Sequence, residues 1–302
     1  MHSTPLYFKP WFRTLVIVVS ILAAVKAYDA FTKVSKRSKR GFSIEKIAPH
    51  KESLLVAPSI SHEQLAAVNA ILQQPFFFLD HGKQCFAFES DDEKWVLKFF
   101  KHGNHLSEID AAHLGKGEKI QESQEKYERL LKSFELAVTA LPDETGIVFY
   151  HFAKTEDLHP ESMLLDRRGK VVHVPMDEVH FVLQRRAKCV KPVLIRLMHE
   201  GKTAEAKKRI DQIFALLITM SRKGIQDRDG ALIRNDNIGF LEDRAIFIDT
   251  GKFSLSKKQL TRADVEHDMR RVRPLANWLQ KNYPDLSLHF EDAQQHALEQ
   301  FS

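Results

Sequence analysis

The chain has 302 residues, 43% of them hydrophobic, which is enough to bury a large core in one two-lobed domain or in two small ones. Its two cysteines, Cys85 and Cys189, exclude a disulfide framework and a cysteine-based metal site, which favours a reducing compartment. The net charge of +5 divides into +8 for residues 1–51 and −3 for the remainder, so the main domain is not expected to bind nucleic acid.

The N-terminal segment holds the most apolar stretch of the chain, Trp11 to Tyr28. A membrane-spanning helix usually needs about 20 apolar residues, so this stretch could span with little tilt. Five basic residues follow between Lys33 and Arg40, which favours a cytoplasmic position for the rest of the chain. The alternative is a cleaved signal peptide with Leu15 to Ala24 as its apolar region, which would export the protein.

The sequence therefore predicts an N-terminal tail (1–10), a transmembrane anchor (11–28) and a basic linker (29–60). If the anchor is correct, the linker could contact anionic lipid head groups of the inner membrane or of the cytoplasmic leaflet.

A strand-rich region follows at 61–185. A helix is predicted from Ser61 to Gln73, with Ser61 as its N-cap. Two strands, Cys85–Glu89 and Trp95–Phe100, come after a turn that contains Gly82. Lys98 lies in the second strand between Leu97 and Phe99, and this apolar setting favours a buried Lys with a partner over an exposed edge residue.

A long amphipathic helix is predicted from Gly117 to Leu141. Glu128 lies at the edge of its apolar stripe, and Glu125 is one turn away. Further strands are predicted at 146–152, 163–165, 171–174 and 180–184.

The region 186–302 is rich in helix patterns. Helices are predicted at Pro192–His199, Ala204–Lys223, Asp264–Tyr283 and Glu291–Phe301. The second of these runs directly into a polar loop after Gly224.

That loop gathers carboxylate and amide side chains. Asp227 and Asp229 open it, Asn235 and Asn237 close it, and a short apolar strand then ends at Asp249. Phosphoryl transfer needs a carboxylate that orients the attacking hydroxyl and hard oxygen ligands that hold magnesium against the phosphates. The simpler alternative is a hairpin loop in which these side chains only form turns.

This stretch resembles the catalytic loop and metal-binding motif of the protein-kinase-like superfamily. Asn237-Ile238-Gly239 is similar to its Asn-Ile piece, and Asp249-Thr250-Gly251 is similar to Asp-Phe-Gly. Asp227-Arg228 is similar to the Asp-Arg of lipid-type kinases. The resemblance covers about residues 76 to 255. It implies an α+β fold with a β-rich small lobe (61–185) and a helical large lobe (186–302), preceded by the membrane helix.

The resemblance also implies a nucleotide site that uses ATP and Mg²⁺. Gly82 would belong to the loop that covers the phosphates, and Lys98 would pair with them while Glu128, or else Glu125, holds it in place. The hinge would be Phe181–Ala187, with Gln184 within it, and would bind adenine through backbone groups.

Asn237 and Asp249 would bind the metal, with Asn235 as an alternative ligand. Asp227 or Asp229 would orient the acceptor hydroxyl. Both aspartates lie farther from Asn237 than the superfamily spacing.

Three hypotheses follow. The chain is a membrane-tethered atypical kinase, a pseudokinase that binds a nucleotide or a protein without catalysis, or an anchored interaction protein of unrelated fold. The sequence has no Ala-Pro-Glu motif, which points to a small-molecule or lipid acceptor, or to a non-catalytic relative.

Overall fold

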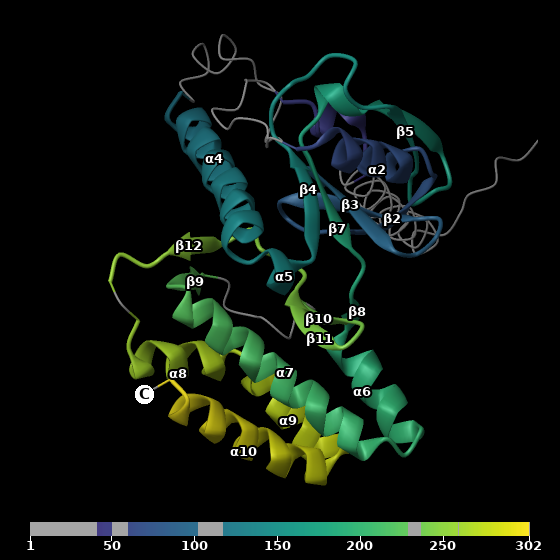
Figure 1. The fold of residues 1–302 in the computed structure, drawn as a ribbon. Helices are drawn as coiled ribbons and strands as arrows, with labels where there is room; N and C mark the ends of the chain where they lie inside the picture. The colour runs from purple at the N-terminus through teal and green to yellow at the C-terminus, as the bar shows by residue number, and fades with distance from the viewer. Residues whose placement is uncertain (1–40, 50–59, 102–116, 229–236, 259, 302) are drawn as a thin grey trace, which may run out of the picture. The chain divides into compact units, whose positions relative to one another are not determined.

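The structure is a computed structural model that describes residues 41–49, 60–101, 117–228, 237–258 and 260–301. The chain separates into two compact units, 1–43 and 44–302, and only 41–43 of the first are described. Everything below concerns the second unit (Figure 1).

A seven-stranded sheet forms the small lobe, in the order β4-β7-β3-β2-β1-β5-β6. Neighbouring strands are antiparallel except β1 and β5, which are parallel. The predicted strands at 163–165 and 171–174 are present as the β5–β6 hairpin, which adds to the edge of β1. The strands are β1 (Phe76–His81), β2 (Cys85–Ser90), β3 (Trp95–Phe100), β4 (Ile147–His151), β5 (Glu161–Leu165), β6 (Val171–Pro175) and β7 (Phe181–Arg185).

The helices of this lobe are α2 (His62–Leu72), α4 (Gly117–Ala140) and the short α5 (Pro142–Thr145), with 3-10 turns η1 (Ile44–Lys46) and η2 (Met176–Glu178). Ser61 caps α2 as predicted, because its side chain accepts from the Gln64 N–H while the Gln64 side chain accepts from the Ser61 N–H.

The two faces of the sheet bury different side chains, because neighbouring residues of a strand point to opposite faces. Phe100 and Val182 belong to the core shared with α4 and the large lobe. The alternate residues Phe99, Phe181 and Leu183 are also buried, on the opposite face.

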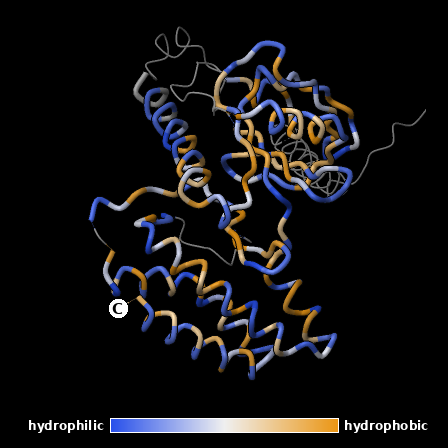
Figure 2. The backbone as a smooth tube through the Cα atoms, viewed as in Figure 1, coloured by the Kyte–Doolittle hydropathy of each residue, from blue (hydrophilic) through white to orange (hydrophobic). Residues whose placement is uncertain are grey.

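The large lobe contains the helices α6 (Val190–His199), α7 (Thr203–Arg222), α8 (Arg262–Arg270), α9 (Arg273–Asn282) and α10 (Pro284–Glu299). Two small sheets lie between these helices and the small lobe: β8 (Lys188–Cys189) with β10 (Ile238–Leu241) and β11 (Arg244–Phe247), and β9 (Ile225–Asp227) with β12 (Phe253–Leu255). Hydrophobic and hydrophilic residues alternate along the large-lobe helices, as expected for helices that bury one side (Figure 2).

Two expectations for the C-terminal helices are wrong. The single helix expected over Asp264–Tyr283 is broken into α8 and α9. Pro274 has no N–H for the carbonyl of Arg270, and its ring would clash with that carbonyl. The last helix begins at Pro284, seven residues before the expected start, with proline in the first turn where its missing N–H costs nothing.

The expected membrane anchor, Trp11 to Tyr28, lies outside the described residues. Among the helices that the structure describes, none has the length and apolar character that crossing a membrane requires.

Candidate functional site

The β10–β11 hairpin brings Asn237 and Asp249 to the same end of two paired strands. Ile238 pairs with Phe247, and one position farther the Ile248 N–H donates to the Asn237 carbonyl at 2.7 Å. Asp249 follows directly. The predicted pair of metal ligands therefore lies at one open end of this hairpin.

Lys98 reaches this point from the other lobe. Its side chain leaves β3 on the face turned toward α4 and the large lobe, and the residue is only 6% exposed. The ammonium Nζ donates to the carbonyl oxygen of Ile248 at 2.5 Å. The ammonium group of the small lobe thus contacts the residue directly before the Asp249 carboxylate of the large lobe.

The Asp249-Thr250-Gly251 turn holds the carboxylate in place. One oxygen, Oδ1, accepts from the Gly251 N–H at 3.0 Å. A Cβ on Gly251 would lie 2.8 Å from Gln84 Oε1 and 2.9 Å from Leu130 Cδ1, so the ends of these two side chains would have to shift to make room for any other residue. No described residue bonds the second carboxylate oxygen, Oδ2, so it is available to a ligand.

Ser133 of α4 anchors the same turn, and sequence reasoning missed it. Its hydroxyl donates to the Thr250 carbonyl and accepts from the Phe253 N–H at 2.6 Å. The available signal was a small polar residue within the buried stripe of a helix, between Leu130 and Ala137. Ser133 is a positioning residue, since it fixes the backbone that carries Asp249.

The donor set at the hairpin end fits magnesium. Carboxylate and amide oxygens are the hard ligands that Mg²⁺ takes in proteins. Asp249 is half-buried with one oxygen available, and Asn237 is 5% exposed beside it.

Asp227 does not lie in a free loop. It is the last residue of β9, and its carboxylate Oδ2 pairs with the Arg271 guanidinium at 2.7 Å. The same guanidinium donates to the Asp227 carbonyl at 2.7 Å and lies 3.4 Å from Asp268. Asp229 and Asn235 lie outside the described residues.

Of the residues expected to bind the cofactor, Gly82 lies in the β1–β2 turn, where its N–H donates to the Cys85 carbonyl at 3.0 Å. A Cβ on Gly82 would meet nothing within 4 Å, so the turn itself does not require glycine. Gln84, two residues on, is the member of this turn that touches the Asp249 segment.

Glu128 is not brought to Lys98. Glu128 is exposed, since the preceding Tyr127 turns inward to bond His180 at 2.7 Å. Glu125 pairs with Arg129 on the surface of the helix. The Gln184 side-chain amide is buried and donates to the carbonyls of Thr145 and Phe247, at 2.7 and 3.1 Å.

Cys85 lies beside the site, on the same sheet face as Lys98. Burial raises the pKa of this thiol to about 11, although the nearby charge of Lys98 acts in the opposite direction.

We expect Cys85 to be a slow nucleophile whose reactivity climbs with pH. Only the thiolate reacts, so the rate of alkylation should rise about tenfold for each pH unit between 7 and 10. Iodoacetamide labelling of a Cys189→Ser variant, followed by mass spectrometry, measures this rate. A rate that levels off near pH 8.5 would mean that the thiol is not buried in this way.

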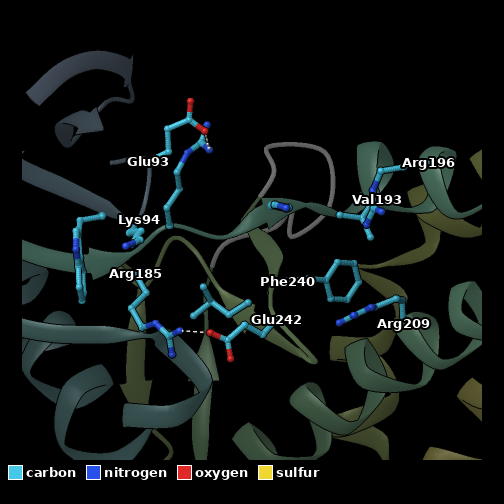
Figure 3. A pocket seen from close by; sticks show the side chains of 12 residues that line it. Glu93, Lys94, Arg185, Val193, Arg196, Arg209, Phe240 and Glu242 are labelled. Atoms are coloured by element: carbon cyan, nitrogen blue, oxygen red, sulfur yellow. Dashed lines mark hydrogen bonds and ion pairs between the residues drawn. The ribbon is translucent and has the colours of Figure 1, made fainter. Parts of the chain in front are cut away.

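A separate cavity of about 600 Å³ lies at the other side of the hinge (Figure 3). Trp95 lines this cavity. It precedes Lys98 by three positions in β3, so the two side chains point to opposite faces of the sheet. Its cations are largely paired, as in Arg185 with Glu242 at 2.5 Å and Arg186 with Glu89 at 2.6 Å. The cavity is therefore distinct from the candidate site.

No family model matches the sequence, and no curated protein matches it. Several solved structures do. A crystal structure of WbdD, described elsewhere as a bifunctional kinase-methyltransferase, is 16% identical with a TM-score of 0.36, over 72% of this chain and 46% of that one. This chain therefore spans less than half of WbdD.

Two aminoglycoside phosphotransferases match over more of their length. APH(2'')-Ib with bound ADP is 10% identical with a TM-score of 0.36, covering 79% of this chain and 86% of that one. APH(2'')-IIa in complex with streptomycin and ATP is 10% identical with a TM-score of 0.37, covering 79% and 85%. These structures are of a bifunctional kinase-methyltransferase and of aminoglycoside phosphotransferases. With TM-scores below 0.5, the function is inferred from this chain's own residues.

Proposed function

We propose that the chain is an atypical kinase that transfers the γ-phosphoryl group of ATP to a hydroxyl acceptor with magnesium. The observation that carries the proposal is the contact of Lys98 with the carbonyl of Ile248, directly before Asp249. A buried cation and a half-buried carboxylate from different lobes are the two charges that a metal–nucleotide complex needs.

In this proposal each residue meets a different part of the nucleotide. Lys98 leaves the Ile248 carbonyl to neutralise the α- and β-phosphates as a point charge. Asn237 and Asp249 would hold Mg²⁺, whose positive charge would offset that of the phosphates. The β1–β2 turn around Gly82 would cover the phosphates, with the hinge around Gln184 at the adenine.

The acceptor hydroxyl would be oriented by Asp227 or Asp229. The ion pair between Asp227 and Arg271 supports Asp229 for this role, because Arg271 already engages the Asp227 carboxylate.

A pseudokinase that binds nucleotide or protein without turnover is the second candidate. It is favoured by the exposure of Glu128, which leaves Lys98 without an ion pair among the described residues. Catalysis and binding therefore have to be measured separately.

Replacing Lys98 with alanine tests the proposal. A lost hydrogen bond to a charged group costs about 1.5–3 kcal/mol, so nucleotide affinity should fall by roughly 10–150-fold. ATP-magnesium thermal shift and release of the γ-phosphate, on the full chain, measure binding and turnover. Lys94→Ala, an exposed lysine at the start of the same strand region, is the control and should match the parent.

The outcomes separate the candidates. A parent that binds ATP, loses this binding in Lys98→Ala, and transfers the γ-phosphate neither to water nor to hydroxyl-bearing acceptors is a pseudokinase. A parent that shows no ATP response at all, with or without magnesium, contradicts both nucleotide proposals.

We also propose that Trp11–Tyr28 tethers the protein to a membrane, with the domain on the cytoplasmic side. The support is the apolar run and the five basic residues after it. Retention in the membrane pellet after alkaline extraction is the expected result. A mature chain that begins near Tyr28 and is found outside the cytoplasm would instead indicate the cleaved signal peptide.

A further inference from the structure

Three side chains able to bind a metal meet on the sheet face opposite Lys98. His151 is the last residue of β4, His159 lies just before β5, and Asp177 lies in η2. One ligand atom from each lies within 4.8 Å of the other two. His151 pairs with Phe181, the neighbour of the residue that pairs with Lys98, which places the cluster on the other face.

Hydrogen bonds determine which nitrogen of each ring carries the hydrogen. His151 Nδ1 lies 2.8 Å from the Val179 carbonyl, which can only accept, so Nδ1 donates. His159 Nδ1 lies 2.8 Å from Asn69 Oδ1, and the Asn69 amide nitrogen is identified by its donation to the Leu158 carbonyl at 2.9 Å. In the neutral rings both Nε2 atoms therefore carry lone pairs.

The cluster has more hydrogen-bond acceptors than hydrogen atoms that can be donated to them. The Thr155 hydroxyl contacts Asp177 Oδ1 and lies 3.0 Å from His151 Nε2, but its single hydrogen serves only one of them. His159 Nε2 is buried without a partner among the described residues, in a side chain that is 9% exposed.

We propose that His151, His159 and Asp177 form a zinc site. Two imidazole nitrogens and one carboxylate oxygen are ligands that Zn²⁺ takes, with the Thr155 hydroxyl or a water in the fourth position. Ring N–H groups held by a carbonyl and an amide oxygen are the outer contacts that orient histidine ligands. A divalent cation would accept the lone pairs of these three ligands, for which the cluster has too few hydrogen-bond donors.

The site would be structural. It joins the end of β4, the segment before β5 and the turn before β7, which otherwise meet through hydrogen bonds to Asp177 from Leu158 and His159 N–H at 3.2 and 3.1 Å. Because it lies on the other face of the sheet, it is independent of the magnesium site at Asp249.

The test is zinc binding to the full chain after removal of metal with a chelator. We expect one tightly bound zinc per chain, and X-ray absorption should give Zn–N distances of about 2.0–2.1 Å from two imidazoles. At a free zinc concentration of about 100 Kd the melting temperature should rise on the order of 5–10 °C.

His159→Phe is the informative variant, since it keeps a ring against Phe149 and Phe181 but removes the Nε2 lone pair. Its zinc affinity should fall by about 100-fold or more, with circular dichroism unchanged. His173→Gln is the matched control, because His173 also pairs with a carboxylate, Glu161, but is exposed. Absence of a stoichiometric zinc in the parent, retention by His159→Phe, or loss in His173→Gln would each overturn the proposal.

Discussion

Replacing Asp249 with alanine is expected to abolish the stabilisation of the protein by ATP and magnesium and to reduce phosphate transfer by roughly 10³-fold or more. The carboxylate is fixed by the Gly251 N–H, and it directly follows Ile248, whose carbonyl accepts from Lys98. A water molecule in the space left by alanine would carry no charge to hold the metal. The measurement is a thermal-shift titration together with phosphate release at saturating ATP.

The control for this result is Asp243→Ala. Asp243 lies at the other end of the same hairpin and is exposed, so its removal should leave the ATP response unchanged. If Asp249→Ala keeps the full response of the parent to magnesium, the metal is held elsewhere and the proposed function is wrong.

Arg271→Met is expected to lower the free energy of unfolding by about 3–5 kcal/mol, because it removes one partner of a buried ion pair. The side chains of Arg271 and Asp227 are 9% and 3% exposed, so the variant leaves the Asp227 carboxylate buried without its guanidinium. Asp268 loses the same guanidinium, and burial already raises the pKa of Asp268. Urea unfolding monitored by circular dichroism measures the change.

A second substitution separates charge from packing. Asp227→Asn in the Arg271→Met background should recover part of the loss, because a neutral amide costs less to bury than a carboxylate. Arg270→Met, at the exposed neighbouring position, should change stability by less than about 0.5 kcal/mol. A loss below about 1 kcal/mol in Arg271→Met would show that the pair is not needed to hold Asp227.

The sequence was informative where local pattern decides the structure. The apolar run around Lys98 predicted a buried strand lysine, and the apolar strand before Asp249 predicted a strand end followed by a glycine turn. Both features are present, and both depend on residues next to each other in the chain.

The sequence was misleading where the structure depends on which side of a helix faces the core, or on a partner that is distant in the sequence. Tyr127 and Glu128 are neighbours on α4 and differ in direction by about 100°, so the inward side chain of Tyr127 turns Glu128 to solvent. The partner of Asp227 is 44 residues away in a helix break that no periodicity indicates. The pairing of β5 with β1, which sets Phe76 opposite Leu164, is still more remote in sequence.

The large-lobe segment that carries Asp249 is fastened to the small lobe at three backbone carbonyls. Gln184 donates to that of Phe247, Lys98 to that of Ile248 and Ser133 to that of Thr250. A swing of the small lobe must either break these bonds or carry the segment along with it.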